Sequence, residues 1–105
     1  MINNIFKNLP TNLSEEIFED IINSDNLKIE RIISNGQSTP QDFWYDQDQD
    51  EWVIVLKGQA CIKFIDNSEI ILNVGDYLNI ESHKKHRVEW TSLIEETIWF
   101  AVHYK

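Results

Sequence analysis

Short apolar segments separated by turn-forming residues follow one another through most of the chain, and this pattern restricts the fold to β architectures. Between Leu27 and Ile33 apolar and polar residues largely alternate, and a period of two is typical of strands. Further strands are expected at Trp52–Leu56, Cys61–Ile65, Glu69–Asn73, Tyr77–Ile80, His86–Trp90 and Trp99–Tyr104. Short strands at this regular spacing predict an all-β sandwich or barrel.

The residues before the first expected strand have a different period and predict one short helix. Ser14 suits the N-cap position, and the two glutamates that follow it suit the positive end of a helix dipole. Apolar residues then fall at helical spacing, at Ile17, Phe18, Ile21 and Ile22. We therefore expect a helix over Ser14–Ile22 within an N-terminal segment of residues 1–25, followed by a barrel over residues 26–105.

Length and charge limit the function classes. A chain of 105 residues is long enough for one domain with a single core. The formal net charge of −9 repels phosphate backbones and anionic lipids, so we expect neither a nucleic-acid nor a membrane partner. Cys61 is the only cysteine, which excludes an intramolecular disulfide and a thiolate metal cluster. A reducing compartment fits, and we expect a soluble cytoplasmic protein.

The spacing of two glycines, one acid and one histidine adds a more specific signal. Six residues separate Glu51 from Gly58, sixteen separate Gly58 from Gly75, and ten separate Gly75 from His86. These intervals resemble the two motifs of the cupin family, G-x5-H-x-H-x3,4-E-x6-G and G-x5-P-x-G-x2-H-x3-N. The stretch from Phe43 to Trp52 and the chain ending also look like those of small single-domain bacterial cupins. The resemblance covers roughly residues 26–104.

The resemblance implies a double-stranded β-helix barrel, but most of the usual metal ligands are replaced. In this sequence the slots of the family's two histidines, proline, second glycine and asparagine hold Tyr45 and Gln47 (or Trp44 and Asp46), Glu81, His83 and Trp90. Gln47, Glu51 and His86, with Tyr45 or His103 as a fourth group, could still hold zinc, iron, manganese or nickel, because divalent metals accept mixed oxygen and nitrogen donors. The alternative is that the same side chains form a hydrogen-bonded polar network inside the barrel.

A ligand pocket can also be placed from strand alternation. Tyr45, Trp90, Trp99 and His103 could line it, although aromatic residues at such positions also serve simply as core. Lys84 and Lys85 follow a turn beside His86 and could orient an anionic ligand at the barrel mouth. The alternative for these two lysines is a solvated turn that pairs with the acidic loop before Glu51.

Three functions remain open on these grounds. The first is a cupin that binds a small molecule in the barrel, with or without a divalent metal. The second is a metal-dependent cupin enzyme of the isomerase, dioxygenase or decarboxylase type, in which Glu51 or His86 handles protons and Tyr45 positions the substrate. The third is a non-catalytic partner-binding protein, which a barrel filled with side chains would favour. The resemblance and the apolar residues on both faces of several strands also lead us to expect a homodimer.

Overall fold

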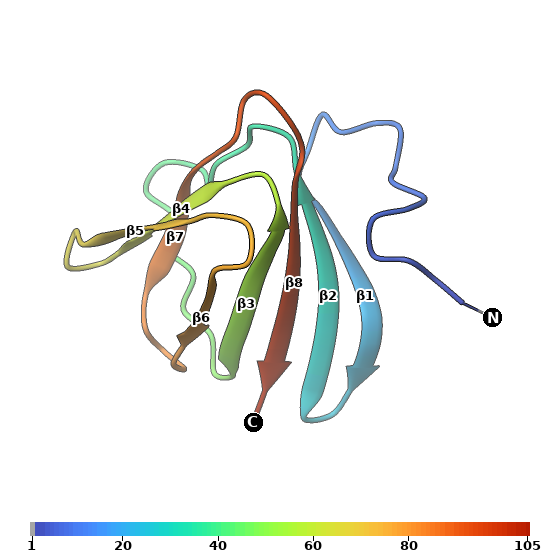
Figure 1. Ribbon diagram of the computed structural model, residues 1–105. Helices are drawn as coiled ribbons and strands as arrows, with labels where there is room; N and C mark the ends of the chain where they lie inside the picture. The colour runs from blue at the N-terminus through green and yellow to red at the C-terminus, as the bar shows by residue number, and fades with distance from the viewer. Residues whose placement is uncertain (1) are drawn as a thin grey trace.

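The computed structural model describes residues 2–105, which form antiparallel strands in two sheets that face one another (Figure 1). The strands are β1 (Ile17–Ser24), β2 (Leu27–Ser34), β3 (Asp50–Lys57), β4 (Ala60–Phe64), β5 (Glu69–Leu72), β6 (Tyr77–Ile80), β7 (His86–Thr91) and β8 (Thr97–Tyr104). One sheet has the order β1-β2-β8-β3-β6, and the other has the order β5-β4-β7. The expected all-β fold is confirmed.

The core lies between the two sheets and follows from strand alternation. Along β3, Glu51, Val53 and Val55 are buried, whereas the residues between them are only half-buried. Strands β4 and β8 add side chains to the same layer, among them Ile62, which is 2% exposed, and Trp99, which is 3% exposed. Burial of each large apolar side chain contributes about 1.5–3 kcal/mol to stability, so this layer fixes which strand faces point inward.

The helix expected at Ser14–Ile22 is wrong, because residues 17–24 form strand β1. This segment pairs antiparallel with β2, and Glu19 of β1 lies opposite Arg31 of β2. The guanidinium of Arg31 binds the Glu19 carboxylate at 2.6 Å and also donates to the carbonyl oxygens of Ile5 and Lys7. An open sheet edge and this ion pair outweigh a local helical pattern that propensity supports only weakly. Within residues 2–105, no helix is long and apolar enough to cross a membrane.

Candidate functional site

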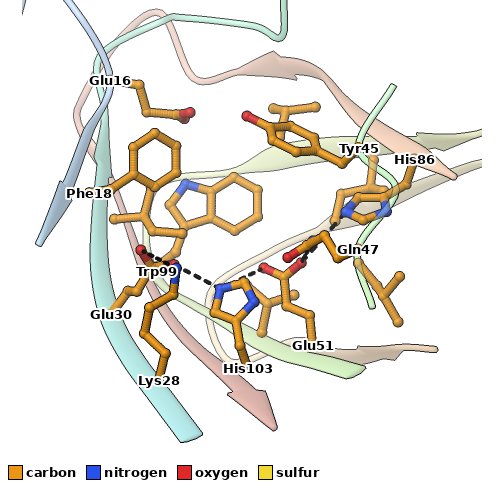
Figure 2. Close-up of a pocket in the computed structure, with 15 residues that line it drawn as sticks. Glu16, Phe18, Lys28, Glu30, Tyr45, Gln47, Glu51, His86, Trp99 and His103 are labelled. Atoms are coloured by element: carbon orange, nitrogen blue, oxygen red, sulfur yellow. Dashed lines mark hydrogen bonds and ion pairs between the residues drawn. The ribbon is translucent and has the colours of Figure 1, made fainter. Parts of the chain in front are cut away.

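A cavity of about 410 Å³ opens between the two sheets, and strands of both contribute to its walls. Figure 2 shows the side chains that surround it. Its lining consists of Glu16, Phe18, Lys28, Glu30, Ile32, Tyr45, Gln47, Glu51, Val53, Ile62, Ile80, His86, Val88, Trp99 and His103. Most of these residues point inward because they occupy the same alternating strand positions as the core residues.

Glu51 lies at the centre of the polar side of this cavity. It projects from β3, where the register places it opposite His103 of β8. The Gln47 amide nitrogen donates to Glu51 Oε1 at 3.1 Å, and His86 Nε2 lies 3.5 Å from the same oxygen. The structure therefore brings together the three residues that we expected from motif spacing, as a direct polar contact between side chains.

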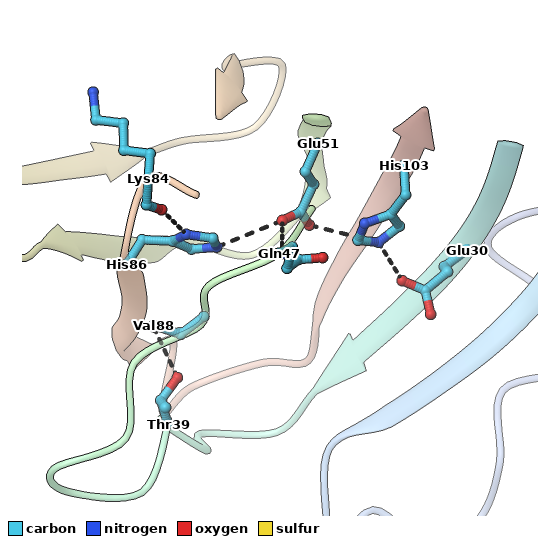
Figure 3. A network of polar contacts seen from close by, with 8 residues as sticks. All are labelled: Glu30, Thr39, Gln47, Glu51, Lys84, His86, Val88 and His103. Carbon is cyan, nitrogen blue, oxygen red and sulfur yellow. Dashed lines mark hydrogen bonds and ion pairs between the residues drawn. The ribbon is translucent and has the colours of Figure 1, made fainter. Parts of the chain in front are cut away.

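His86 is held in one orientation by its neighbours. Its Nδ1–H donates to the Lys84 carbonyl oxygen at 2.8 Å, which leaves Nε2 to face Glu51 (Figure 3). An isolated antiparallel β-bridge joins the backbones of Tyr45 and His86, and the Tyr45 N–H donates to His86 O at 2.8 Å. The two rings stack with centroids 5.7 Å apart. The imidazole is thus positioned before any ligand arrives.

His103 forms a second buried pair, with Glu30 of β2. His103 Nε2 lies 2.7 Å from Glu30 Oε1 and 3.9 Å from Glu51 Oε2, so the two imidazoles and two carboxylates form one series across the cavity (Figure 3). Lys28 Nζ lies 3.7 Å from the other Glu30 oxygen. Glu30 was missed by the sequence reasoning because it shares the more polar face of β2 with Lys28, and alternation alone assigns such a face to solvent although this one lines the cavity.

The electrostatics of the central pair favour its charged form. Burial raises the pKa of Glu51, but the contacts with His86, His103 and Gln47 outweigh burial and leave that pKa below the ordinary value of 4.5. Burial lowers the pKa of His86, but the bonds to Glu51 and to the Lys84 carbonyl raise it above 6.5. The pair therefore presents an ionised carboxylate beside an imidazolium over a range of moderately acidic pH.

The remaining expected pocket residues are divided. Tyr45, Trp99 and His103 line the cavity, and the Trp99 indole N–H donates to Ser34 Oγ at 3.1 Å. Trp90 does not line it, because Glu89 is an extra residue in β7: Cys61 pairs with Trp90, whereas Ile62 pairs with Val88. Such a β-bulge reverses which side chains point inward beyond it.

The two lysines lie outside the cavity. The Lys84 ammonium sits over the Phe64 ring, 4.5 Å from its centroid, and Figure 3 shows that side chain directed away from His86. Lys85 is exposed, and its carbonyl oxygen accepts a bond from the Ile65 N–H. Neither lysine is among the lining residues, so the cationic groups at the cavity are Lys28 and the two histidines.

The comparison with protein families decides what kind of barrel this is. The family model described as the cupin domain matches residues 30–103, which is more than half of the chain. The protein is a cupin. A comparison with curated proteins finds no match.

Solved structures of other cupins extend this result. A Ralstonia eutropha JMP134 protein that carries the provisional name mannose-6-phosphate isomerase is 44% identical, with a TM-score of 0.94, and the alignment covers 100% of this chain and 98% of that one. A cupin superfamily protein of Desulfitobacterium hafniense DCB-2 is 20% identical, with a TM-score of 0.76 over 91% and 83% of the two chains. The similarity to the Desulfitobacterium protein concerns the fold alone.

A structure of HppE with Fe(II) also shares the fold, at 16% identity and a TM-score of 0.74, over 91% of this chain and 53% of that one. In the present protein, the side chains around the cavity match poorly the sets of donor atoms that hold a metal tightly. Across residues 2–105, no three His, Cys, Asp or Glu side chains are grouped so that they could hold an ion. His103 Nε2 is already bound to Glu30, and the His86 ring is held by the Lys84 carbonyl oxygen at Nδ1 and faces Glu51 through Nε2. The polar network explains the same residues without a metal.

Proposed function

We propose that this cupin binds a small hydroxyl-bearing molecule in the cavity between its sheets. The observation that carries the proposal is the series of His86, Glu51, His103 and Glu30 along one wall of a cavity of about 410 Å³. Carboxylates accept hydrogen bonds and imidazoles donate them, so the wall offers both kinds of partner to hydroxyl groups. The volume is in the range of small-molecule sites.

The charge of the lining argues for a hydroxyl-bearing ligand in preference to an anion. Three carboxylates line the cavity, those of Glu16, Glu30 and Glu51, and the two lysines that we expected to attract an anion do not. A phosphate or carboxylate in the cavity would therefore meet like charges in a partly desolvated space. The provisional name of the 44% identical relative refers to a sugar phosphate; its sugar part supports a hydroxyl-bearing ligand, whereas its phosphate part favours an anion.

A calorimetric screen tests this proposal. Hexoses and pentoses are titrated into the protein, each beside its phosphorylated form, and we expect the uncharged sugars to bind more tightly. Glu51→Gln is expected to weaken binding, because it removes the charge that orders the network, whereas Glu81→Gln on an exposed residue is expected to leave binding unchanged. Tighter binding of the phosphates, or full binding by Glu51→Gln, would contradict the proposal.

A second candidate is an isomerase that works through proton transfer. Glu51 as an ionised base and His86 as a protonated acid lie 3.5 Å apart, which suits removal of a proton beside a carbonyl group and its return to a neighbouring atom. Incubation with sugar phosphates and free sugars in deuterium oxide tests it, because NMR detects deuterium at the exchanged carbon. Exchange that survives both Glu51→Gln and His86→Asn would argue against it.

The other expectations become parts of this proposal or alternatives to it. A cavity of this size favours ligand binding over the partner-binding hypothesis, which a filled barrel would have favoured. Metal-dependent dioxygenase or decarboxylase chemistry would need a metal on Gln47, Glu51 and His86, and metal analysis of untagged protein checks for it. We retain a cytoplasmic homodimer as a proposal that rests on family membership, and sedimentation equilibrium measures its mass.

A further inference from the structure

The end of the cavity next to β1 differs from the polar wall, because aromatic rings and one carboxylate form it. Phe18 comes from β1, Trp99 from β8 and Tyr45 from the loop before β3, and Glu16 directly precedes β1. Figure 2 shows the Glu16 carboxylate and the Tyr45 phenol oxygen directed toward one another, with the rings of Phe18 and Trp99 in the same part of the cavity. This end therefore combines three ring systems with one acidic group.

Among residues 2–105, the charge of Glu16 has no cationic partner. Its Oε2 accepts a hydrogen bond from the Ser34 hydroxyl, which in turn accepts from the Trp99 indole N–H. Within the part of the chain that the structure describes, no Lys, Arg or His side chain forms an ion pair with Glu16. The other two carboxylates of the cavity each have such partners.

We propose that this end of the cavity binds an organic cation, an ammonium group carried by the ligand, with Glu16 as its counter-ion. The faces of aromatic rings attract such cations, and the attraction strengthens where water is excluded. Glu16 is half-buried, and a partly desolvated carboxylate without an ion-pair partner is stabilised when an opposite charge joins it. The inference rests on the proposed function, since it names the charge of the molecule that occupies the same cavity.

The state of Glu16 without ligand agrees with this assignment. Burial raises the pKa of Glu16, and the hydrogen bond from Ser34 only partly opposes that rise. The Glu16 charge in turn contributes to the raised pKa of Tyr45, after burial itself. A cation bound between them would stabilise the ionised carboxylate and reverse both effects.

Tetramethylammonium tests the inference because its shape is close to that of uncharged tert-butanol. Both are titrated into the whole protein at constant ionic strength, and the NMR signal of the Trp99 indole N–H reports occupancy. We expect the cation to shift that signal and to bind about tenfold more tightly than tert-butanol, as one favourable cation–ring contact would give. Equal binding of the two probes, or no shift with the cation, would overturn the proposal.

Variants assign the effect to these residues. Glu16→Gln keeps a group that accepts the Ser34 bond and should abolish the preference for the cation, whereas Glu15→Gln, on the exposed neighbour, should retain it. Phe18→Leu should weaken cation binding and Phe6→Leu should not, although both residues are 50% exposed. A preference that survives Glu16→Gln contradicts the inference. The sugar screen is a separate readout, so failure of the hydroxyl-bearing ligand and failure of the cation site are distinguishable.

Discussion

At the scale of single residues, the two histidines near the turn before β7 differ in what surrounds them. His86 is 6% exposed and paired with Glu51, whereas the side chain of His83 is 67% exposed and pairs with Asp46 at 2.8 Å. Solvent screens the exposed pair, so its contribution to stability is small. Two histidines three positions apart therefore have different roles, and only the buried one is coupled to the cavity.

We expect His86→Asn to lower the free energy of unfolding in a pH-dependent way. The raised pKa of His86 makes its stabilising contribution complete below about pH 6.5 and lost as pH rises through the folded-state value. The lowered pKa of Glu51 makes its contribution complete above about pH 4.5 and lost as pH falls through its own folded-state value. Denaturant titrations should therefore show a larger loss near pH 5.5 than near pH 9.

His83→Asn is the control for that comparison, because asparagine tolerates the positive φ of 62° that His83 adopts. This variant should show a small effect that varies little between the two conditions. If both variants showed the same pH profile, the assignment of the coupling to the buried pair would be wrong.

Cys61 should be nearly inert in the folded protein. Burial, with the charge of Glu69 and a hydrogen bond to it, raises the pKa of this thiol to about 11. At pH 8 its thiolate fraction is then about a hundredfold below that of an ordinary thiol, and access is restricted as well. A disulfide reagent should react slowly with native protein and rapidly in denaturant. Rapid reaction in both states would show that the strand opens readily.

At the scale of elements, the turn between β3 and β4 has no room for a side chain. Gly58 has a φ of 85°, and a Cβ atom there would lie 2.4 Å from Thr97 Oγ1 and 2.8 Å from Thr97 Cα. Gly75 has a φ of 90°, but a Cβ atom there would meet nothing within 4 Å. The two glycines share a backbone conformation and differ in crowding.

Gly58→Ala should therefore destabilise the protein by about 3 kcal/mol or more, since backbone strain adds to a clash with backbone atoms. Gly75→Ala should cost only the strain, about 1 kcal/mol. Chemical denaturation of both variants measures the difference. Equal losses would mean that the loop before β8 moves away without cost.

Sequence reasoning succeeded where side-chain period and motif spacing carry the information. The strands and the convergence of Gln47, Glu51 and His86 follow from alternation and from the intervals between glycines, an acid and a histidine. The prediction of a helix failed because β1 forms by pairing with the open edge of β2, and a local sequence pattern does not reveal such a partner. Glu30 was missed because it lies on the more polar face of β2, which alternation alone assigns to solvent. Trp90 was misplaced because the sequence gives no sign of the extra residue in β7.

At the scale of the whole molecule, the formal net charge of −9 over 105 residues gives a self-repelling surface around an acidic cavity. Raising sodium chloride from about 0.01 M to about 0.15 M shortens the screening length from roughly 30 Å to roughly 8 Å. The free energy of unfolding should therefore rise over this range, by about 1 kcal/mol. The control reverses two exposed acids, Asp25→Lys and Glu95→Lys, which changes the net charge by +4 to −5. A gain as large in that variant as in the parent would show that screening of net charge is not the cause.

The bulge at Glu89 has a consequence for how this barrel could diversify. Beyond Glu89, Thr91 rather than Trp90 faces the neighbouring sheet, and Thr91 is 2% exposed with its hydroxyl donating to the Gln37 carbonyl oxygen at 2.6 Å. Loss of the Glu89 codon would remove the bulge and still leave Trp90 opposite Cys61 and Thr91 opposite Ala60, so the same side chains would face inward. Related barrels could thus gain or lose one residue at this point of the strand and keep the same interior.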